Sequence, residues 1–280
     1  FAAVPGAAAG SGAGNPVAAR YVALGDSYAS GYGIGPQESK VCDRAKTSSY
    51  PALLSASYRS ASFRNVACSG ATTRSIWNAE HGQPPQIKAL RPDTTLVTLT
   101  LGGNDIGFKE LAVVCAGLSR QDPTGDPCRD NFKQGDTDQH LARIETLKPR
   151  IADVLTDIKR KSPRARIALV GYPSVLPDSG KSCRSSEVPL ADGDFSYLRN
   201  ITKRLNSALA EQARKAGAIY VDTYTPTIGH DMCADTTQRL IEPLLTAKGG
   251  IAPAAAHPNL RGQLSLTLIT KQAIDKATGR

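Results

Sequence analysis

The stretch "YVALGDSYASG", residues 21–31, joins a short apolar run to a group of small and polar residues. Such a run followed by Gly25 predicts a buried β-strand that ends in a turn. Asp26 and Ser27 then lie just beyond the carboxyl end of the strand. Serine at this place often caps a following helix, which would account for Ser27. The alternative is a reactive serine, and the rest of the sequence has to distinguish the two.

Four more segments have the same character, a short run of Val, Ile, Leu and Thr that ends in turn residues. They are residues 63–67, 94–105, 165–173 and 218–226. Between strands, apolar residues recur every three or four positions over 141–158 and 198–209, which predicts amphipathic helices. Strands that alternate with helices predict a three-layer α/β/α fold with a central five-stranded parallel sheet.

The 280 residues fit one α/β domain, and no change of composition divides them. We therefore predict a single domain over residues 20–280. Residues 1–19 are rich in Ala, Gly and Pro and carry no charge, which predicts a flexible N-terminal tail. Gly and Pro recur too often there for a membrane helix or a signal-peptide core. The chain begins with Phe, as it would if an export signal had been removed.

The balance of charge is basic, with 34 Lys and Arg against 25 Asp and Glu and a formal charge of +9. Such a balance favours anionic partners. The densest basic run, residues 159–166, has no aromatic residues among its cations, unlike a nucleic-acid platform. We therefore expect no nucleic-acid partner, while attraction to anionic lipid or polysaccharide stays open.

The six cysteines form no C-x-x-C pair and have no histidine at ligand spacing, so we expect no metal site. An even number without metal spacing favours disulfides and an oxidising compartment, with buried free thiols as the alternative. All six lie in or near loops that follow predicted strands, which favours pairing between neighbours. The expected pairs are Cys42–Cys68, Cys115–Cys128 and Cys183–Cys233.

The residues that follow each strand are informative, because ligands of parallel sheets bind beyond the carboxyl ends of the strands. Ser27 follows the first strand, "CSG" with Gly70 the second, "GGND" with Asn104 the third, and "GYP", residues 171–173, the fourth. Acyl transfer needs a nucleophile, a base and donors to the oxyanion. Ser27 can supply a hydroxyl and an N–H, Gly70 a second N–H, and Asn104 an amide. Taken singly, the glycine motifs are explained by turn formation.

The base for such a reaction has to be one of four histidines. His81 lies in a polar loop and His140 opens a predicted helix, which favours solvated roles for both. His230 lies in "GHDMC", where a structural role in the loop suffices. His257 follows the fifth strand and precedes a final helical pattern, so its loop can return to the same edge of the sheet.

Four motifs in order, "GDSYASG", "CSGAT", "GGND" and "HPN", resemble the four sequence blocks of the SGNH hydrolases, also called GDSL esterases and lipases. The resemblance covers about residues 21–273, and the cysteines with residues 189–199 look like the secreted actinobacterial lipases and phospholipases. It implies a flavodoxin-like fold and cofactor-free hydrolysis of carboxylic esters. It also implies an acyl-enzyme on Ser27, His257 as base, and Ser27, Gly70 and Asn104 as oxyanion-hole donors.

The sequence departs from the family beside His257. The family commonly has Asp three residues before this histidine, whereas Ala254 stands there. We therefore predict that the main-chain carbonyl of Ala254 or Ala255 accepts a hydrogen bond from Nδ1 of His257, with Asp222 and Asp235 as long-range alternatives. A neutral carbonyl fixes the tautomer, but it stabilises the imidazolium less than a carboxylate would.

The function expected is that of a secreted serine esterase or lipase, monomeric, acting on acylglycerol, phospholipid or short-chain acyl esters. Transient contact with a lipid surface is also expected. Two alternatives stay open: a carbohydrate-ester deacetylase, and a non-catalytic secreted binding protein on the same fold. The aromatic content of 5% and the lack of an obvious amphipathic lid favour short or soluble esters.

Overall fold

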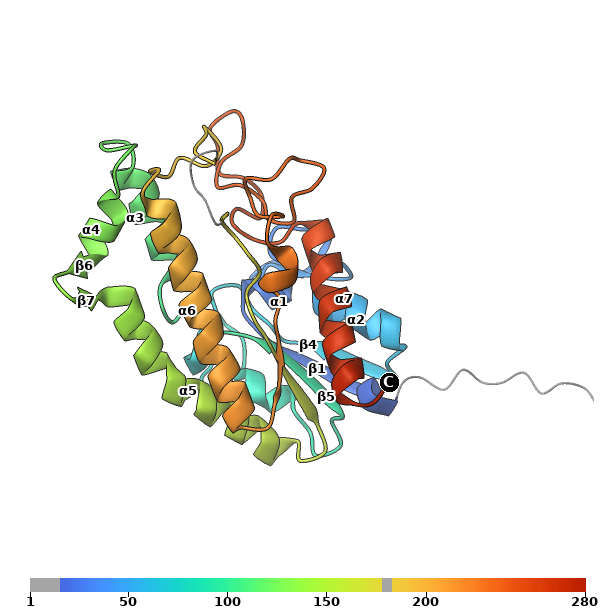
Figure 1. Ribbon diagram of the computed structural model, residues 1–280. Coiled ribbons are helices and arrows are strands. Elements are labelled where there is room, and N and C mark those ends of the chain that lie inside the picture. The colour runs from blue at the N-terminus through green and yellow to red at the C-terminus, as the bar shows by residue number, and fades with distance from the viewer. Residues whose placement is uncertain (1–15, 178–182) are drawn as a thin grey trace, which may run out of the picture.

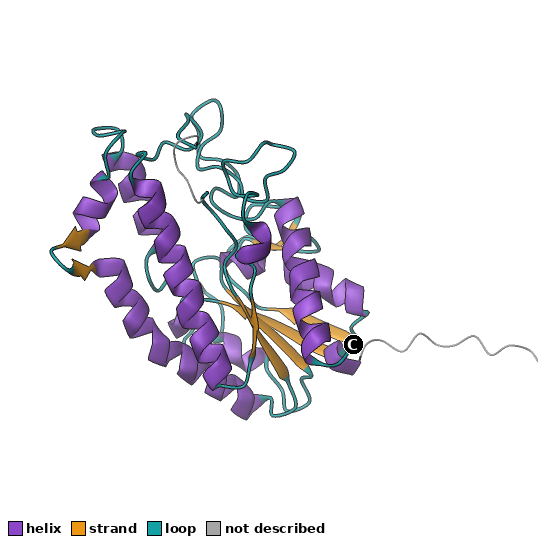
Figure 2. Ribbon diagram, viewed as in Figure 1, coloured by secondary structure: helices purple, strands orange, loops and turns teal. Residues whose placement is uncertain are grey.

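A five-stranded parallel sheet forms the centre of the computed structural model, which describes residues 16–177 and 183–280 (Figure 1). Helices cover both faces of this sheet (Figure 2). The strands of the sheet are β1 Arg20–Gly25, β4 Ser62–Asn65, β5 Leu96–Thr100, β8 Arg166–Val170 and β9 Ile219–Val221. Each of the five predicted strands is present, and the predicted three-layer α/β/α fold is confirmed.

The strand order β4-β1-β5-β8-β9 explains where a ligand can bind. Numbered along the chain, these five strands lie in the order 2-1-3-4-5, which is the flavodoxin order. The chain adds β4 on one side of β1 and then crosses to add β5 on the other. In sheets of this order, ligands bind beside the loops that follow these two strands. Ser27 and Asn104 lie on those two loops.

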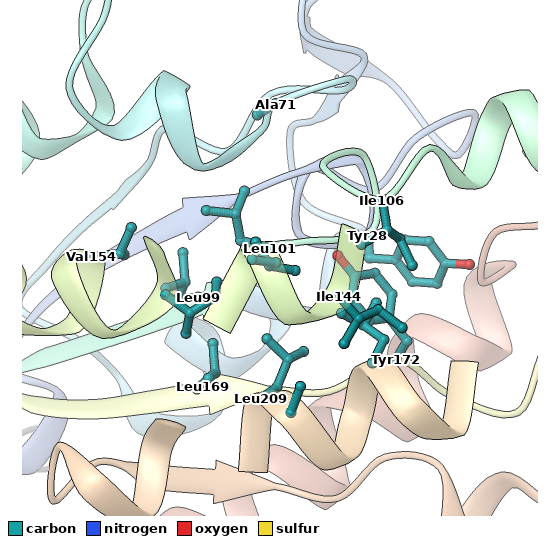
Figure 3. Close-up of a cluster of buried hydrophobic side chains, with 14 of the residues drawn as sticks. Tyr28, Ala71, Leu99, Leu101, Ile106, Ile144, Val154, Leu169, Tyr172 and Leu209 are labelled. Carbon is teal, nitrogen blue, oxygen red and sulfur yellow. The ribbon is translucent and has the colours of Figure 1, made fainter. Parts of the chain in front are cut away.

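The three central strands β1, β5 and β8 bury both of their faces, in agreement with the apolar runs that predicted them. Val22, Leu24, Val97 and Leu99 belong to one buried cluster, whereas Tyr21, Ala23 and Leu96 belong to a second one on the other face. The first cluster includes side chains of α5 Gln139–Lys161 and α6 Asp194–Lys215, as Figure 3 shows for Ile144, Val154 and Leu209. The second includes side chains of α2 Tyr50–Tyr58 and α7 Leu260–Ala277.

The long helices are α2 Tyr50–Tyr58, α3 Phe108–Leu118, α4 Pro127–Phe132, α5 Gln139–Lys161, α6 Asp194–Lys215 and α7 Leu260–Ala277. The predicted periodic segments 141–158 and 198–209 lie within α5 and α6, and the final helical pattern is α7, whereas α2, α3 and α4 were not predicted. Shorter helical elements are α1 Ser27–Ser30, η1 Pro16–Ala18, η2 Thr73–Ile76, η3 Gln86–Ala89 and η4 Thr225–Thr227. Among the described residues, no helix is both long and apolar enough to cross a membrane.

Two small hairpins lie outside the main sheet and were not predicted. They pair β2 Gln37–Ser39 with β3 Arg44–Ala45, and β6 Lys133–Gln134 with β7 Thr137–Asp138. Strands of two or three residues are too short to display an alternating pattern, so the sequence carries no periodic signal for them.

The predicted tail, residues 1–19, lies largely outside the described residues. At its end, Pro16–Ala18 form a single 3-10 turn, and Ala18 is fully buried in the second cluster. The folded part of the chain therefore includes these residues, which precede the predicted domain start at residue 20.

Three disulfides join segments that follow the strands of the sheet. They join Cys42 to Cys68, Cys115 to Cys128 and Cys183 to Cys233, the pairing expected from the strand order. The first of them anchors the loop that carries Gly70, because the Ser69 N–H also donates to the Cys42 carbonyl at 3.0 Å.

Gly25, at the end of β1, lies too close to Thr100 of β5 to carry a side chain. Its φ is +132°, and a Cβ there would overlap the Thr100 carbonyl oxygen and lie 3.0 Å from the Thr100 nitrogen. We expect Gly25→Ala to lower the free energy of unfolding by roughly 3 kcal/mol, because backbone strain and overpacking add. Urea denaturation tests this. In the control Gly217→Ala, φ is also positive but nothing lies within 4 Å, so a loss of only about 1–2 kcal/mol is expected; equal losses would contradict the steric explanation.

Candidate active site

Ser27 and His257 form a hydrogen-bonded pair at the carboxyl end of β1. His257 Nε2 lies 2.7 Å from Ser27 Oγ, within the range required of a nucleophile and its base. Ser27 is the first residue of α1 and is 6% exposed. The capping role considered for it belongs instead to Asp26, whose carboxylate accepts the Tyr28 N–H at 2.9 Å. The Ser27 hydroxyl is therefore available to His257.

A backbone carbonyl orients the imidazole of His257. Nδ1 lies 2.7 Å from the Ala255 carbonyl oxygen, and donation there leaves Nε2 as the acceptor that faces Ser27. Of the two carbonyls predicted, Ala255 is thus the one in contact. Both ring nitrogens are now accounted for, which leaves none for the alternatives Asp222 and Asp235. Asp222 instead accepts two backbone N–H groups of its own turn.

The loop that holds His257 has an unusual backbone. Ala254 and Ala256 have φ values of 55° and 60°, a left-handed conformation that costs alanine on the order of 1 kcal/mol each. The loop is secured by hydrogen bonds on both sides. Tyr28 Oη donates to the Ala256 carbonyl at 2.7 Å, and the Ala256 N–H donates to the main-chain carbonyl of Glu242 at 3.1 Å.

Two tyrosine rings pack beside the half-buried imidazole. Tyr28 and Tyr32 lie with ring centroids 4.8 and 4.7 Å from that of His257. This burial lowers the pKa of His257 to about 4, opposed in part by the hydrogen bond to Ala255. The neutral imidazole, which is the form that can accept a proton, is therefore favoured.

Gly70 and Asn104, the other two predicted donors, lie on loops that are bonded to each other. The Ala71 N–H donates to Cys68 at 3.0 Å across a turn in which Gly70 has a φ of +80°, as a type II turn requires. Asn104 Nδ2 donates to the Ala71 carbonyl at 2.9 Å. A primary amide has a second N–H, which this bond leaves available.

Asp105, the last residue of "GGND", provides a second link between these loops. Its carboxylate accepts hydrogen bonds from the Thr73 N–H at 3.0 Å and the Thr73 hydroxyl at 2.5 Å. Burial raises the pKa of Asp105, and the bonds from Thr73 oppose that shift. Sequence reasoning assigned no role to either residue.

Asp26 and Tyr172 are buried beside Ser27 and were also missed. Tyr172, from the "GYP" segment, donates its hydroxyl proton to Asp26 Oδ2 at 2.5 Å and accepts the Gly103 N–H at 2.7 Å. Burial raises the pKa of Asp26 to about 7, although its hydrogen bonds from Tyr172 and Tyr28 oppose the shift. The sequence feature that could have identified them is their position just after predicted strands.

The other histidines lie elsewhere. His81 is exposed, with its ring near Gly70, and His230 Nδ1 lies 3.0 Å from the Gln238 carbonyl, as a structural loop role requires. The solvated role expected for His140 is wrong. It is fully buried, because α4 packs Phe132 against its ring at 4.5 Å between centroids, and burial lowers the pKa of His140.

Within the described residues, no group of three or more His, Cys, Asp or Glu side chains is arranged to hold a metal ion.

Comparison with known proteins decides the family. The model of the GDSL-like Lipase/Acylhydrolase family matches residues 23–264, which include all four motifs. The chain belongs to this family. It is 36% identical over 248 residues to Lipase 2 of Streptomyces coelicolor, covering 87% of this chain and 81% of the relative. As a member with lipase and esterase relatives, it is a carboxylic ester hydrolase, which sets the non-catalytic alternative aside.

Solved structures agree with this assignment. An extracellular lipase from Streptomyces rimosus superposes with a TM-score of 0.76 at 29% identity, covering 91% of this chain and 100% of that one. A phospholipase A1 from Streptomyces albidoflavus superposes with a TM-score of 0.75 at 30% identity, covering 91% and 99%. The resemblance drawn from the sequence motifs is therefore confirmed.

The low pKa of His257 predicts how the site responds to acid. Because burial depresses the pKa to about 4, the imidazole is expected to stay neutral as the pH falls through the ordinary value near 6.5 and to gain its proton only near pH 4. An NMR titration of the ring, assigned by comparison with His257→Gln, measures this directly. A midpoint at or above the ordinary value would contradict the burial of the ring.

Proposed function

We propose that the protein is a secreted serine esterase or lipase that forms an acyl-enzyme on Ser27. The observation that carries the proposal is the 2.7 Å contact between Ser27 Oγ and His257 Nε2, with Nδ1 occupied by the Ala255 carbonyl. Nucleophile, base and orienting group are thereby present in the order that serine acyl transfer requires.

In the first half of the reaction, His257 takes the Ser27 proton as Oγ attacks the ester carbonyl carbon. The negative charge that develops on the carbonyl oxygen is stabilised by the N–H groups of Ser27 and Gly70 and by the Asn104 amide. The tetrahedral intermediate collapses, and His257 protonates the departing alcohol. Water then attacks the acyl-enzyme by the same steps, with His257 first as base and then as acid, and the free acid leaves.

The substrates proposed are acylglycerol, phospholipid or short-chain acyl esters. Relatives described as a lipase and as a phospholipase A1 support lipid esters. No observation specifically favours the carbohydrate-ester deacetylase.

The three disulfides support an oxidising, extracellular location, as does the relative described as an extracellular lipase. Since one chain supplies every group of the candidate site, we propose that it acts as a monomer.

The role of Ser27 is tested by substitution and by covalent capture. Ser27→Ala is expected to abolish hydrolysis of a soluble p-nitrophenyl ester without unfolding the protein. Asn104→Ala is expected to lower kcat by about a hundredfold or more, because one oxyanion donor is lost. A fluorophosphonate probe should label the wild-type protein on Ser27, located by peptide mass spectrometry. Retained turnover in Ser27→Ala would overturn the assignment.

Transient contact with a lipid surface has support from two exposed aliphatic side chains. Ile251 is 80% and Leu260 is 52% exposed, and they lie on either side of His257 along the chain. Exposed aliphatic side chains can insert among acyl chains, where their burial is favourable.

Substitution of both side chains tests this contact. The double variant Ile251→Ser with Leu260→Ser is expected to lose about a hundredfold in activity on anionic phospholipid vesicles, because each of the two insertions contributes roughly 1.5 kcal/mol. Activity on a soluble ester should stay unchanged. Leu141→Ser, at the start of α5 and 37% exposed, is the control. Equal losses on both substrates would refute lipid contact.

A further inference from the structure

A buried chain of hydrogen bonds runs between the ends of three strands. The Gly103 N–H after β5 donates to Tyr172 Oη at 2.7 Å, and the Tyr172 hydroxyl after β8 donates to Asp26 Oδ2 at 2.5 Å. The second oxygen of Asp26, after β1, accepts the Tyr28 N–H at 2.9 Å. Tyr172 is fully buried and Asp26 is 1% exposed, so water does not compete for these bonds.

Each end of this chain holds a residue of the candidate active site. Asp26 caps α1 and directly precedes Ser27, and its own N–H donates to the Thr100 carbonyl of β5 at 2.9 Å. Gly103 directly precedes Asn104, and a Cβ on Gly103 would lie 3.0 Å from Tyr172 Oη. The phenol therefore sits directly against the peptide that carries the predicted oxyanion donor.

The surroundings of Tyr172 leave its ring little freedom. Its backbone N–H and carbonyl are both bonded to the side-chain amide of Asn206 on α6, each at 2.8 Å. Tyr28 and Phe108 pack edge-on against the ring, with centroids 5.0 and 5.6 Å away. Figure 3 shows Tyr28 and Tyr172 together at one end of the buried cluster.

Helix capping alone does not account for a carboxylate at position 26. Asparagine caps helices about as well as aspartate and carries no charge to desolvate. Tyr172 Oη, however, already accepts the Gly103 N–H and offers its own proton, so it needs an acceptor. Only a carboxylate has one acceptor oxygen for Tyr172 and another for the Tyr28 N–H.

We propose that Tyr172 is a positioning residue of the active site, whose phenol, held by the Asp26 carboxylate, fixes the Gly103–Asn104 segment relative to Ser27. The inference rests on the proposed function, because the Asn104 amide matters only if an oxyanion forms. A displaced donor stabilises the transition state less than a correctly placed one, while ground-state binding of the ester is affected little.

Tyr172→Phe removes the hydroxyl and keeps the ring. We expect kcat on a soluble ester to fall about ten- to hundredfold with KM nearly unchanged, a smaller loss than for Asn104→Ala because the donor is displaced rather than removed. The inhibition constant of an alkylboronic acid, which mimics the tetrahedral intermediate, should rise in proportion to the loss of kcat/KM.

The control is Tyr21→Phe, which removes a buried hydroxyl bonded to Thr98 Oγ1 at 2.7 Å in the same sheet. Its kcat should stay within about twofold of wild type, since it lies outside the site.

The Asp26→Asn variant tests the same chain from its other end. It keeps the helix cap but presents an N–H₂ group to Tyr172, so a similar loss of kcat is expected. The double variant Asp26→Asn with Tyr172→Phe should lose no more than the worse single variant, because both act through one chain of bonds.

A kcat for Tyr172→Phe within about twofold of wild type, or losses that multiply in the double variant, would overturn the proposal. Failure of the proposed function would give a different set of results from failure of this inference. Ser27→Ala would then retain turnover, and the wild-type protein would not be labelled by the fluorophosphonate.

Discussion

The hydrogen bond between Ser27 Oγ and His257 Nε2 joins two residues 230 positions apart, and the surrounding structure keeps that contact in place. On the serine side, the constraint is the end of β1, where Asp26 caps α1 and presents Ser27 at its first position. On the histidine side, a loop with two left-handed alanines carries the imidazole back over α1. Tyr28 joins the two sides, because its backbone N–H bonds to Asp26 and its hydroxyl bonds to the histidine loop.

Burial shifts the pKa values of the two titratable groups beside Ser27 in opposite directions for the same physical reason. It lowers the pKa of His257 to about 4 and raises that of Asp26 to about 7, since desolvation disfavours the charged form of each. A site poor in free charge suits acyl transfer, because an oxyanion and an imidazolium that appear together interact strongly when water is excluded. The hydrogen bonds to Asp26 offset part of its desolvation, which ties the charge of this carboxylate to the geometry of Tyr172.

The features that could be predicted from sequence are those with a local signal. Five β-rich runs ending in turn residues were enough for the sheet, and the residues after them contained Ser27, Gly70 and Asn104. The choice between Ala254 and Ala255 depends on backbone angles that alanine rarely adopts, so no propensity could decide it. Tyr172 and Asp26 are 146 residues apart, and only the sheet order brings them together. The burial of His140 likewise depends on how α4 packs, which helix periodicity does not reveal.

The neutral partner of His257 has consequences for the rest of the site. A carboxylate would stabilise the imidazolium that forms when Ser27 gives up its proton, whereas the Ala255 carbonyl offers only a dipole. In the proposed mechanism, the remaining stabilisation of the transition state comes from the oxyanion side, from the proposed donors on the loops after β1, β4 and β5. These loops are also the most extensively cross-bonded part of the site, through Asn104 to Ala71, Asp105 to Thr73 and Gly103 to Tyr172. In this proposal, the accurate placement of the oxyanion donors compensates for the absence of a carboxylate next to His257.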